Sequence, residues 1–127
     1  MAAEAIIYLR RVLHLFKLTG RLRRRAFLWR VPALYIVAFA CYGLPVLAET
    51  KFNSTATYWQ NVSFLAIVGC FYLVITHSVK RLHDIDLRGW WLLFSLLPIA
   101  NLILGSGMQF IAGTQGPNRF GPDPKNN

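Results

Sequence analysis

Three long apolar runs, separated by short polar segments, dominate the chain. They cover residues 26–48, 58–79 and 90–112, and a helix needs roughly 18–20 apolar residues to cross a bilayer core. The apolar positions are clustered rather than periodic, which favours helices in lipid over the one-sided helices of a soluble domain. We therefore predict an all-α integral membrane protein with three transmembrane helices, forming a single membrane domain over residues 1–127.

Residues 5–18 show a different pattern. Ile6, Leu9, Leu13 and Phe16 recur at spacings of three and four, while basic side chains fill the other face. This pattern predicts a basic amphipathic helix that lies on the membrane surface before the first span. A helix packed against the protein's own spans has the same periodicity and is the alternative.

The third run contains Pro98 and Asn101 near its middle. A proline with a polar neighbour is compatible with a kinked span or with a re-entrant hairpin. Three full spans place the tail, residues 113–127, outside the cell, whereas a hairpin returns it to the cytoplasm. The tail is rich in Gly, Pro and Asn, a composition typical of disorder.

Charge gives the orientation. The chain carries 14 Lys and Arg against five Asp and Glu, and the basic residues gather before the first run and between the second and third. The loop at 49–57 carries only Glu49 and Lys51. Because Lys and Arg concentrate in cytoplasmic loops, we expect a cytoplasmic N-terminus and a cytoplasmic hinge at 80–89. The long basic start and Arg30 fit a cleaved signal peptide poorly.

Several function classes find no support in the sequence. Cys41 and Cys70 fall inside apolar runs, and there is no C-x-x-C spacing among three His and two Cys, so we expect neither a metal site nor a redox site. No nucleophile elbow or phosphate loop is present. The positive charge lies in a membrane-directed segment without a nucleic-acid-binding module. We expect no cofactor, no catalytic residue and no nucleic-acid partner.

The hinge holds the candidate cluster. On a continuing helix, spacings of three and four place several charged residues on one face, with Arg81 and Asp84 close enough to pair. Structural pairing, binding of lipid headgroups and catalysis all remain open for that pair. His83 could act as a base, but its neighbour Asp84 diverges from it by about 100° on a helix. The full candidate cluster is Arg21, Arg24, Arg25, His77, Lys80, Arg81, His83, Asp84 and Arg88.

Three sequence blocks carry a resemblance to a known family. They are 20–25 (GRLRRR) followed by Phe27 and Trp29, 80–84 (KRLHD) leading through Gly89 to Trp90, Trp91 and Pro98, and 113–124 (GTQGPNRFGPDP). With these blocks the chain resembles the "domain of unknown function 805" family of small bacterial inner-membrane proteins. Ala26 stands where the family often has an acidic residue, and Lys80 replaces the usual first Arg of the hinge block.

The resemblance implies an inner-membrane fold of three spans or four helical segments, and it implies no reaction. It also implies that part of 116–124 is ordered against the hinge or a loop, with Asn118, Arg119, Phe120, Gly121 and Asp123 as its motif residues.

The density of basic groups at the cytoplasmic interface favours a non-enzymatic scaffold or accessory protein. Its expected partners are anionic lipid headgroups together with a second copy of the chain or another membrane protein. A channel or transporter component that works as an oligomer is the alternative. The small number of polar residues inside the apolar runs argues against it.

Overall fold

The computed structural model describes residues 2–52 and 56–125, which form helices and irregular segments without a β-strand. The helices are α1 (Ala2–Phe16), α2 (Arg24–Phe52), α3 (Ala56–Asp84), the 3₁₀-helix η1 (Gly89–Leu96) and α4 (Pro98–Phe110). Residues 126 and 127 of the expected tail lie outside the described part.

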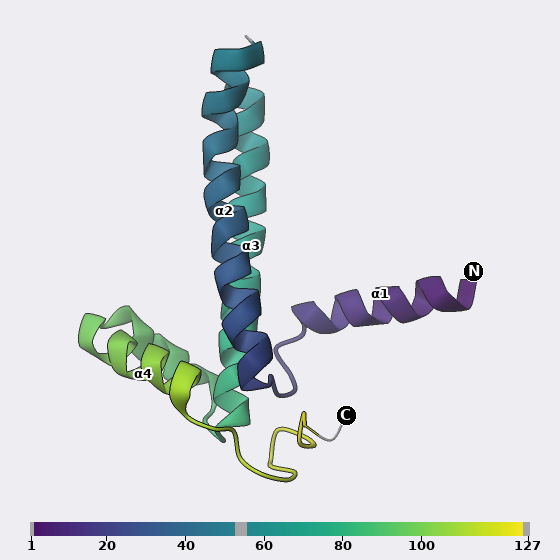
Figure 1. Cartoon of the computed structure of the whole chain (residues 1–127), viewed down its shortest axis with the longest axis vertical. Helices are drawn as coiled ribbons and strands as arrows, with labels where there is room; N and C mark the ends of the chain where they lie inside the picture. The colour runs from purple at the N-terminus through teal and green to yellow at the C-terminus, as the bar shows by residue number, and fades with distance from the viewer. Residues whose placement is uncertain (1, 53–55, 126–127) are drawn as a thin grey trace.

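Two long helices form the body of the molecule. α2 and α3 pack side by side along their length (Figure 1). Among the described residues, the two segments long and apolar enough to cross a membrane are Arg24–Lys51 and Thr57–Asp84, and only 6% and 28% of their most apolar windows are buried. Large apolar side chains such as Trp29, Phe39 and Tyr42 are more than 70% exposed. Such an uncovered surface is typical of a protein in contact with lipid rather than water.

The expected third span is not confirmed, because the structure divides that segment in two. At 13 residues α4 is about 20 Å long, shorter than the roughly 30 Å of a bilayer core. Leu97 is extended, with φ −89° and ψ 126°, and Pro98 begins α4, as expected because proline disfavours a helical conformation in the residue before it. η1 and α4 thus make a helical hairpin that leaves and returns to the Asp84 end of α3 (Figure 1). This arrangement matches the hairpin alternative.

The small core lies where this hairpin meets the long helices. Leu22, Phe27, Leu82 and Met108 are buried together there, and the backbone N–H of Leu22 donates to the carbonyl of Lys80 at 3.1 Å. We call this end of the α2–α3 pair the hinge end. It brings together the segment before α2, the end of α3, the hairpin and the tail.

The N-terminal helix α1 lies outside this core and projects sideways from the long helices (Figure 1). Its apolar residues Ile6, Leu9 and Leu13 are more than half exposed. One end is held by α3, where the Tyr72 hydroxyl donates to the Phe16 carbonyl at 2.9 Å and the two rings stack. The helix therefore has an apolar surface that the chain itself leaves uncovered.

The hairpin predicts the side on which the tail is accessible. In a Cys41→Ala/Cys70→Ala background, Gln115→Cys and Arg88→Cys should react with an impermeant maleimide from the same side of the membrane, because both lie at the hinge end. Glu49→Cys should react from the opposite side. Labelling of sealed, oriented vesicles checks this. If Gln115→Cys reacts from the same side as Glu49→Cys, the third apolar run crosses the membrane and the hairpin is wrong.

Candidate functional site

Asp84, the last residue of α3, is at the centre of a buried ion cluster. Its carboxylate accepts hydrogen bonds from Arg81 on the same helix and from Arg21 in the segment before α2, at 3.1 Å from Nε. The side chains of Arg21, Arg81 and Asp84 are 1%, 0% and 5% exposed. The spacing of three residues on α3 does produce the predicted pair of Arg81 and Asp84, and Arg21 joins it from 63 residues away.

The other guanidinium nitrogens of the two arginines donate to backbone carbonyls and, from Arg21, to the Thr114 hydroxyl. Arg81 Nε donates to Met108 at 2.7 Å and Nη2 donates to Ile111, so this side chain holds the end of α4. Arg21 donates to the carbonyls of Thr114 at 2.6 Å and Gly116 at 2.7 Å. We call Arg21, Arg81 and Asp84 the buried triad. It connects four segments of the chain and leaves little guanidinium surface for a ligand.

The tail passes so close to Asp84 that only glycine fits at one position. A Cβ atom added to Gly113 would lie 2.0 Å from Oδ2 of Asp84, far inside van der Waals contact. At the next residue, the Thr114 N–H donates to the Asp84 carbonyl at 2.8 Å. The backbone at 113–114 is therefore fixed directly against the end of α3.

His83 points away from the triad and anchors the tail. Its Nδ1–H donates to the Gly20 carbonyl at 3.1 Å, and its ring stacks on Phe120 with centroids 4.0 Å apart. Asn118 Nδ2 donates to the His83 carbonyl at 2.9 Å. Since this ring is stacked and hydrogen-bonded, and turned away from the Asp84 carboxylate, the geometry gives His83 a packing role.

Two further contacts order the tail. Arg119 pairs with Asp86 at 3.1 Å, both side chains being about half exposed. The Asp123 carboxylate accepts from the N–H groups of Lys125 at 2.9 Å and Gly116 at 3.0 Å. These two bonds lower the pKa of the Asp123 carboxyl below its ordinary value of 3.8. The tail, including Gly121 at φ 137°, thus lies against the hinge, as the resemblance implies.

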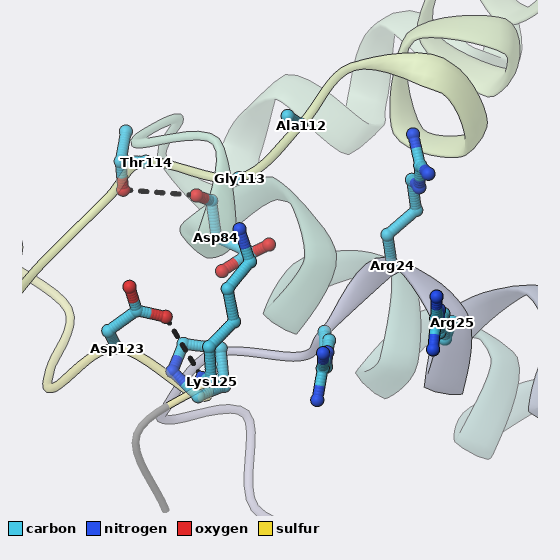
Figure 2. A pocket seen from close by; sticks show the side chains of 10 residues that line it. Arg24, Arg25, Asp84, Ala112, Gly113, Thr114, Asp123 and Lys125 are labelled. Atoms are coloured by element: carbon cyan, nitrogen blue, oxygen red, sulfur yellow. Dashed lines mark hydrogen bonds between the residues drawn. The ribbon is translucent and has the colours of Figure 1, made fainter.

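Beside the triad is a hollow of about 220 Å³ that we call the basic pocket. Figure 2 shows Arg24 and Arg25 of α2 on one side and Thr114, Asp123 and Lys125 of the tail on the other. Its lining residues are Arg23, Arg24, Arg25, Asp84, Ala112, Gly113, Thr114, Asp123, Pro124 and Lys125.

The basic pocket has the electrostatics of an anion site. Arg24 donates to the Phe110 carbonyl at 3.2 Å, whereas no hydrogen bond or ion pair is formed by the side chains of Arg23 and Arg25 within the described residues. The carboxylate of Asp84 is already matched by two arginines. The first turn of α2 also presents backbone N–H groups without helical partners, which favour negative charge.

The comparisons with known proteins agree with the sequence blocks. The family described as "Protein of unknown function (DUF805)" matches residues 15–122. The chain belongs to the DUF805 family. No solved structure matches it.

Two curated relatives come from Escherichia coli (strain K12). Inner membrane protein YhaH is 36% identical over 73 residues, which is 53% of this chain and 60% of YhaH. Inner membrane protein YhaI is 34% identical over 64 residues, 50% of this chain and 54% of YhaI. The alignments thus span less than two thirds of either relative. The names of these relatives and the two apolar helices support a membrane protein of the uncharacterised DUF805 family.

The structure divides the predicted cluster of this DUF805 protein into groups with different surroundings. Arg24 and Arg25 line the basic pocket, which shares Asp84 with the buried triad. His77 is buried on α3, where its Nδ1–H donates to the Leu73 carbonyl at 2.7 Å. Lys80 is also buried on α3, and Arg88 is exposed directly before η1. The nine residues therefore do not form one site.

Sequence reasoning left several lining residues of the basic pocket off the candidate cluster. Arg23 lies beside two chosen arginines and has the same chemistry, so the signal was present. Gly113 and Thr114 belong to the third sequence block, but only their approach to Asp84 shows why those residue types are needed. Lys125 follows that block and gives no local signal of its own.

The buried triad predicts a large difference between two acidic residues. Asp84→Asn leaves two buried guanidinium groups without a charge partner, a change that typically costs about 3–5 kcal/mol. Asp86→Asn removes an exposed pair and should cost about 0–1 kcal/mol. Thermal unfolding in a mild detergent checks this, and equal loss of stability in both variants would contradict the central place of Asp84.

The hydrogen bonds that Asp123 accepts in the tail predict that its carboxyl titrates with a lowered pKa. Because the pKa of Asp123 in the folded protein lies below 3.8, the ionised carboxylate stabilises the tail at pH values above 3.8. This stabilisation is lost as the pH falls through the lowered pKa. The Gly116 and Lys125 amide resonances should follow this titration in NMR spectra and should not do so in Asp123→Asn. A midpoint at or above 3.8 would show that the two hydrogen bonds do not form.

Proposed function

We propose that this protein is a non-enzymatic inner-membrane protein that binds the phosphate of an anionic lipid headgroup in its basic pocket. The observation that supports this most is that the side chains of Arg23 and Arg25 have no partner in the described part of the chain and lie on a hollow whose acidic groups already accept hydrogen bonds. Guanidinium groups match phosphate oxygens with paired donors.

The position of the basic pocket along the long helices fits the headgroup layer. Arg24–Lys51 contains 28 residues, or about 42 Å of helix, close to the roughly 40–45 Å of a bilayer with its headgroups. If α2 spans the bilayer, its first turn therefore lies among the headgroups. Arg30 and Trp29, about 9 Å further along, then lie at the edge of the hydrocarbon core, where both residue types are common.

The charge distribution supports placing this end in the cytoplasm. The hinge end carries the basic residues of 21–25 and 80–88, whereas the charged residues at the other ends of α2 and α3 are Glu49 and Lys51. In this orientation α1 extends sideways near the cytoplasmic surface (Figure 1). Its uncovered apolar residues and Arg10 suit an amphipathic helix that lies in the interface.

The proposal is tested by lipid binding. Removing two basic side chains, in Arg23→Ala/Arg25→Ala, should weaken retention of phosphatidylglycerol about thirtyfold, at about 1 kcal/mol for each. Native mass spectrometry of protein released from a mild detergent measures the retained lipid, with phosphatidylcholine as the neutral comparison. Lys51→Ala/Arg88→Ala is the matched control, because it removes the same charge from exposed sites outside the pocket.

In this experiment the double control variant should retain phosphatidylglycerol as the unaltered protein does. If Arg23→Ala/Arg25→Ala retains as much phosphatidylglycerol as the unaltered protein, the lipid does not bind in the basic pocket. Equal retention of phosphatidylcholine by the unaltered protein would remove the requirement for an anionic headgroup.

A further inference from the structure

A second, larger hollow lies between the long helices and the hairpin. It has a volume of about 820 Å³, within the range of about 300–1,000 Å³ that is typical of ligand sites. Phe27, Val31 and Ile36 of α2 line one side, and Leu92, Gly105 and Met108 of the hairpin line another. We call it the apolar hollow.

The apolar hollow begins next to the basic pocket. On α2, Phe27 and Leu28 follow Arg24 by three and four residues, which is one helical turn. On the hairpin side, Gln109 of the apolar hollow precedes Ala112 of the basic pocket by three residues. The hydrogen bond from Arg24 to the Phe110 carbonyl, 3.2 Å long, lies where the two meet.

Its depth corresponds to one leaflet. From Phe27 to Ile36 the apolar hollow follows α2 for about 14 Å, and half of a bilayer core is about 15 Å. A space at this depth in the membrane is in contact with acyl chains. The basic pocket at one end supplies charge complementary to a phosphate.

We propose that the apolar hollow holds an acyl chain of the same anionic phospholipid whose phosphate lies in the basic pocket. This inference rests on the proposed headgroup site and names the rest of its ligand. The side-chain amide of Gln109 is exposed and has no hydrogen-bond partner in the described part of the chain. Gln109 lines the apolar hollow three residues before Ala112 of the basic pocket, where the ester groups of such a lipid would pass.

Gly105 provides a variant that fills the apolar hollow without disturbing the packing. It lines the hollow on α4, and a Cβ atom added there meets nothing within 4 Å. Leucine also has a higher helix propensity than glycine, so Gly105→Leu should fold. Gly43→Leu is the matched control, because Gly43 on α2 is equally unobstructed and does not line the hollow.

The test uses two probes with one headgroup, dioleoyl- and dihexanoyl-phosphatidylglycerol, titrated against each variant by native mass spectrometry. Gly105→Leu should weaken binding of the long-chain lipid about tenfold, because the new side chain displaces about two buried methylene groups of the acyl chain. It should leave the short-chain lipid unaffected. Gly43→Leu should bind both probes as the unaltered protein does, and Arg23→Ala/Arg25→Ala should lose affinity for both.

The outcomes separate the two proposals. If Gly105→Leu binds the long-chain lipid normally, the acyl chain lies elsewhere and this inference is overturned while the headgroup site stands. If Gly105→Leu instead converts a dimer to a monomer, a second copy of the chain occupies the apolar hollow and the inference is again overturned. If Arg23→Ala/Arg25→Ala binds both probes normally while Gly105→Leu loses affinity for the long-chain lipid, the headgroup site is wrong and the acyl-chain site remains.

Discussion

The fold of the hinge end depends on one carboxylate shared by two buried arginines. Asp84 is the last residue of α3, a position where the helix dipole disfavours negative charge, and it is almost completely buried. Arg21 and Arg81 make this position tolerable. Together they carry one positive charge more than Asp84 can match, and backbone carbonyls accept the remaining N–H groups. Two of those carbonyls, Met108 and Ile111, lie at the negative end of α4.

This arrangement constrains the topology. Because Arg81 requires the carbonyls at the end of α4, that end must return to the hinge end of α3. The segment from Gly89 to Phe110 cannot then end on the opposite side of the long helices. The tail follows from the same constraint, since Gly113 is already against Asp84 and Thr114 accepts from Arg21. One ion cluster therefore determines the path of about forty residues.

The sequence predicts the parts of this structure that depend on local pattern. Continuous apolar runs predict the two long helices. Spacings of three and four predict that the second helix continues through the hinge to Arg88, with Gly89 ending it, whereas α3 ends at Asp84. The third run has the length and apolarity of a span, so only Pro98 and Asn101 indicated a hairpin. The contact that decides it, between Arg81 and the carbonyl of Met108, joins residues 27 apart and has no signature in composition or periodicity.

The same limit applies within the basic run at 21–25. Its arginines are chemically alike in the sequence, yet Arg21 is buried against Asp84 whereas Arg23 and Arg25 are exposed on the basic pocket. Sequence spacing cannot distinguish the buried arginine from the exposed ones, because Arg21 lies before the helix that carries Arg24 and Arg25. Only the path of residues 20–23 decides which guanidinium enters the core.

This division of the basic run also bears on the lipid proposals. A buried arginine that is saturated by a carboxylate and carbonyls gains little from a phosphate, whereas an exposed arginine at the headgroup layer gains charge-assisted hydrogen bonds. The hairpin that the buried triad holds in place has an apolar space of about 820 Å³ beside it. Within a bilayer, an apolar space at the depth of the hydrocarbon core is surrounded by acyl chains, which are therefore the groups best placed to occupy it. The triad would then create both parts of the lipid site without touching the ligand, by holding the end of α4 beside the first turn of α2, where Arg24 donates to the Phe110 carbonyl at 3.2 Å.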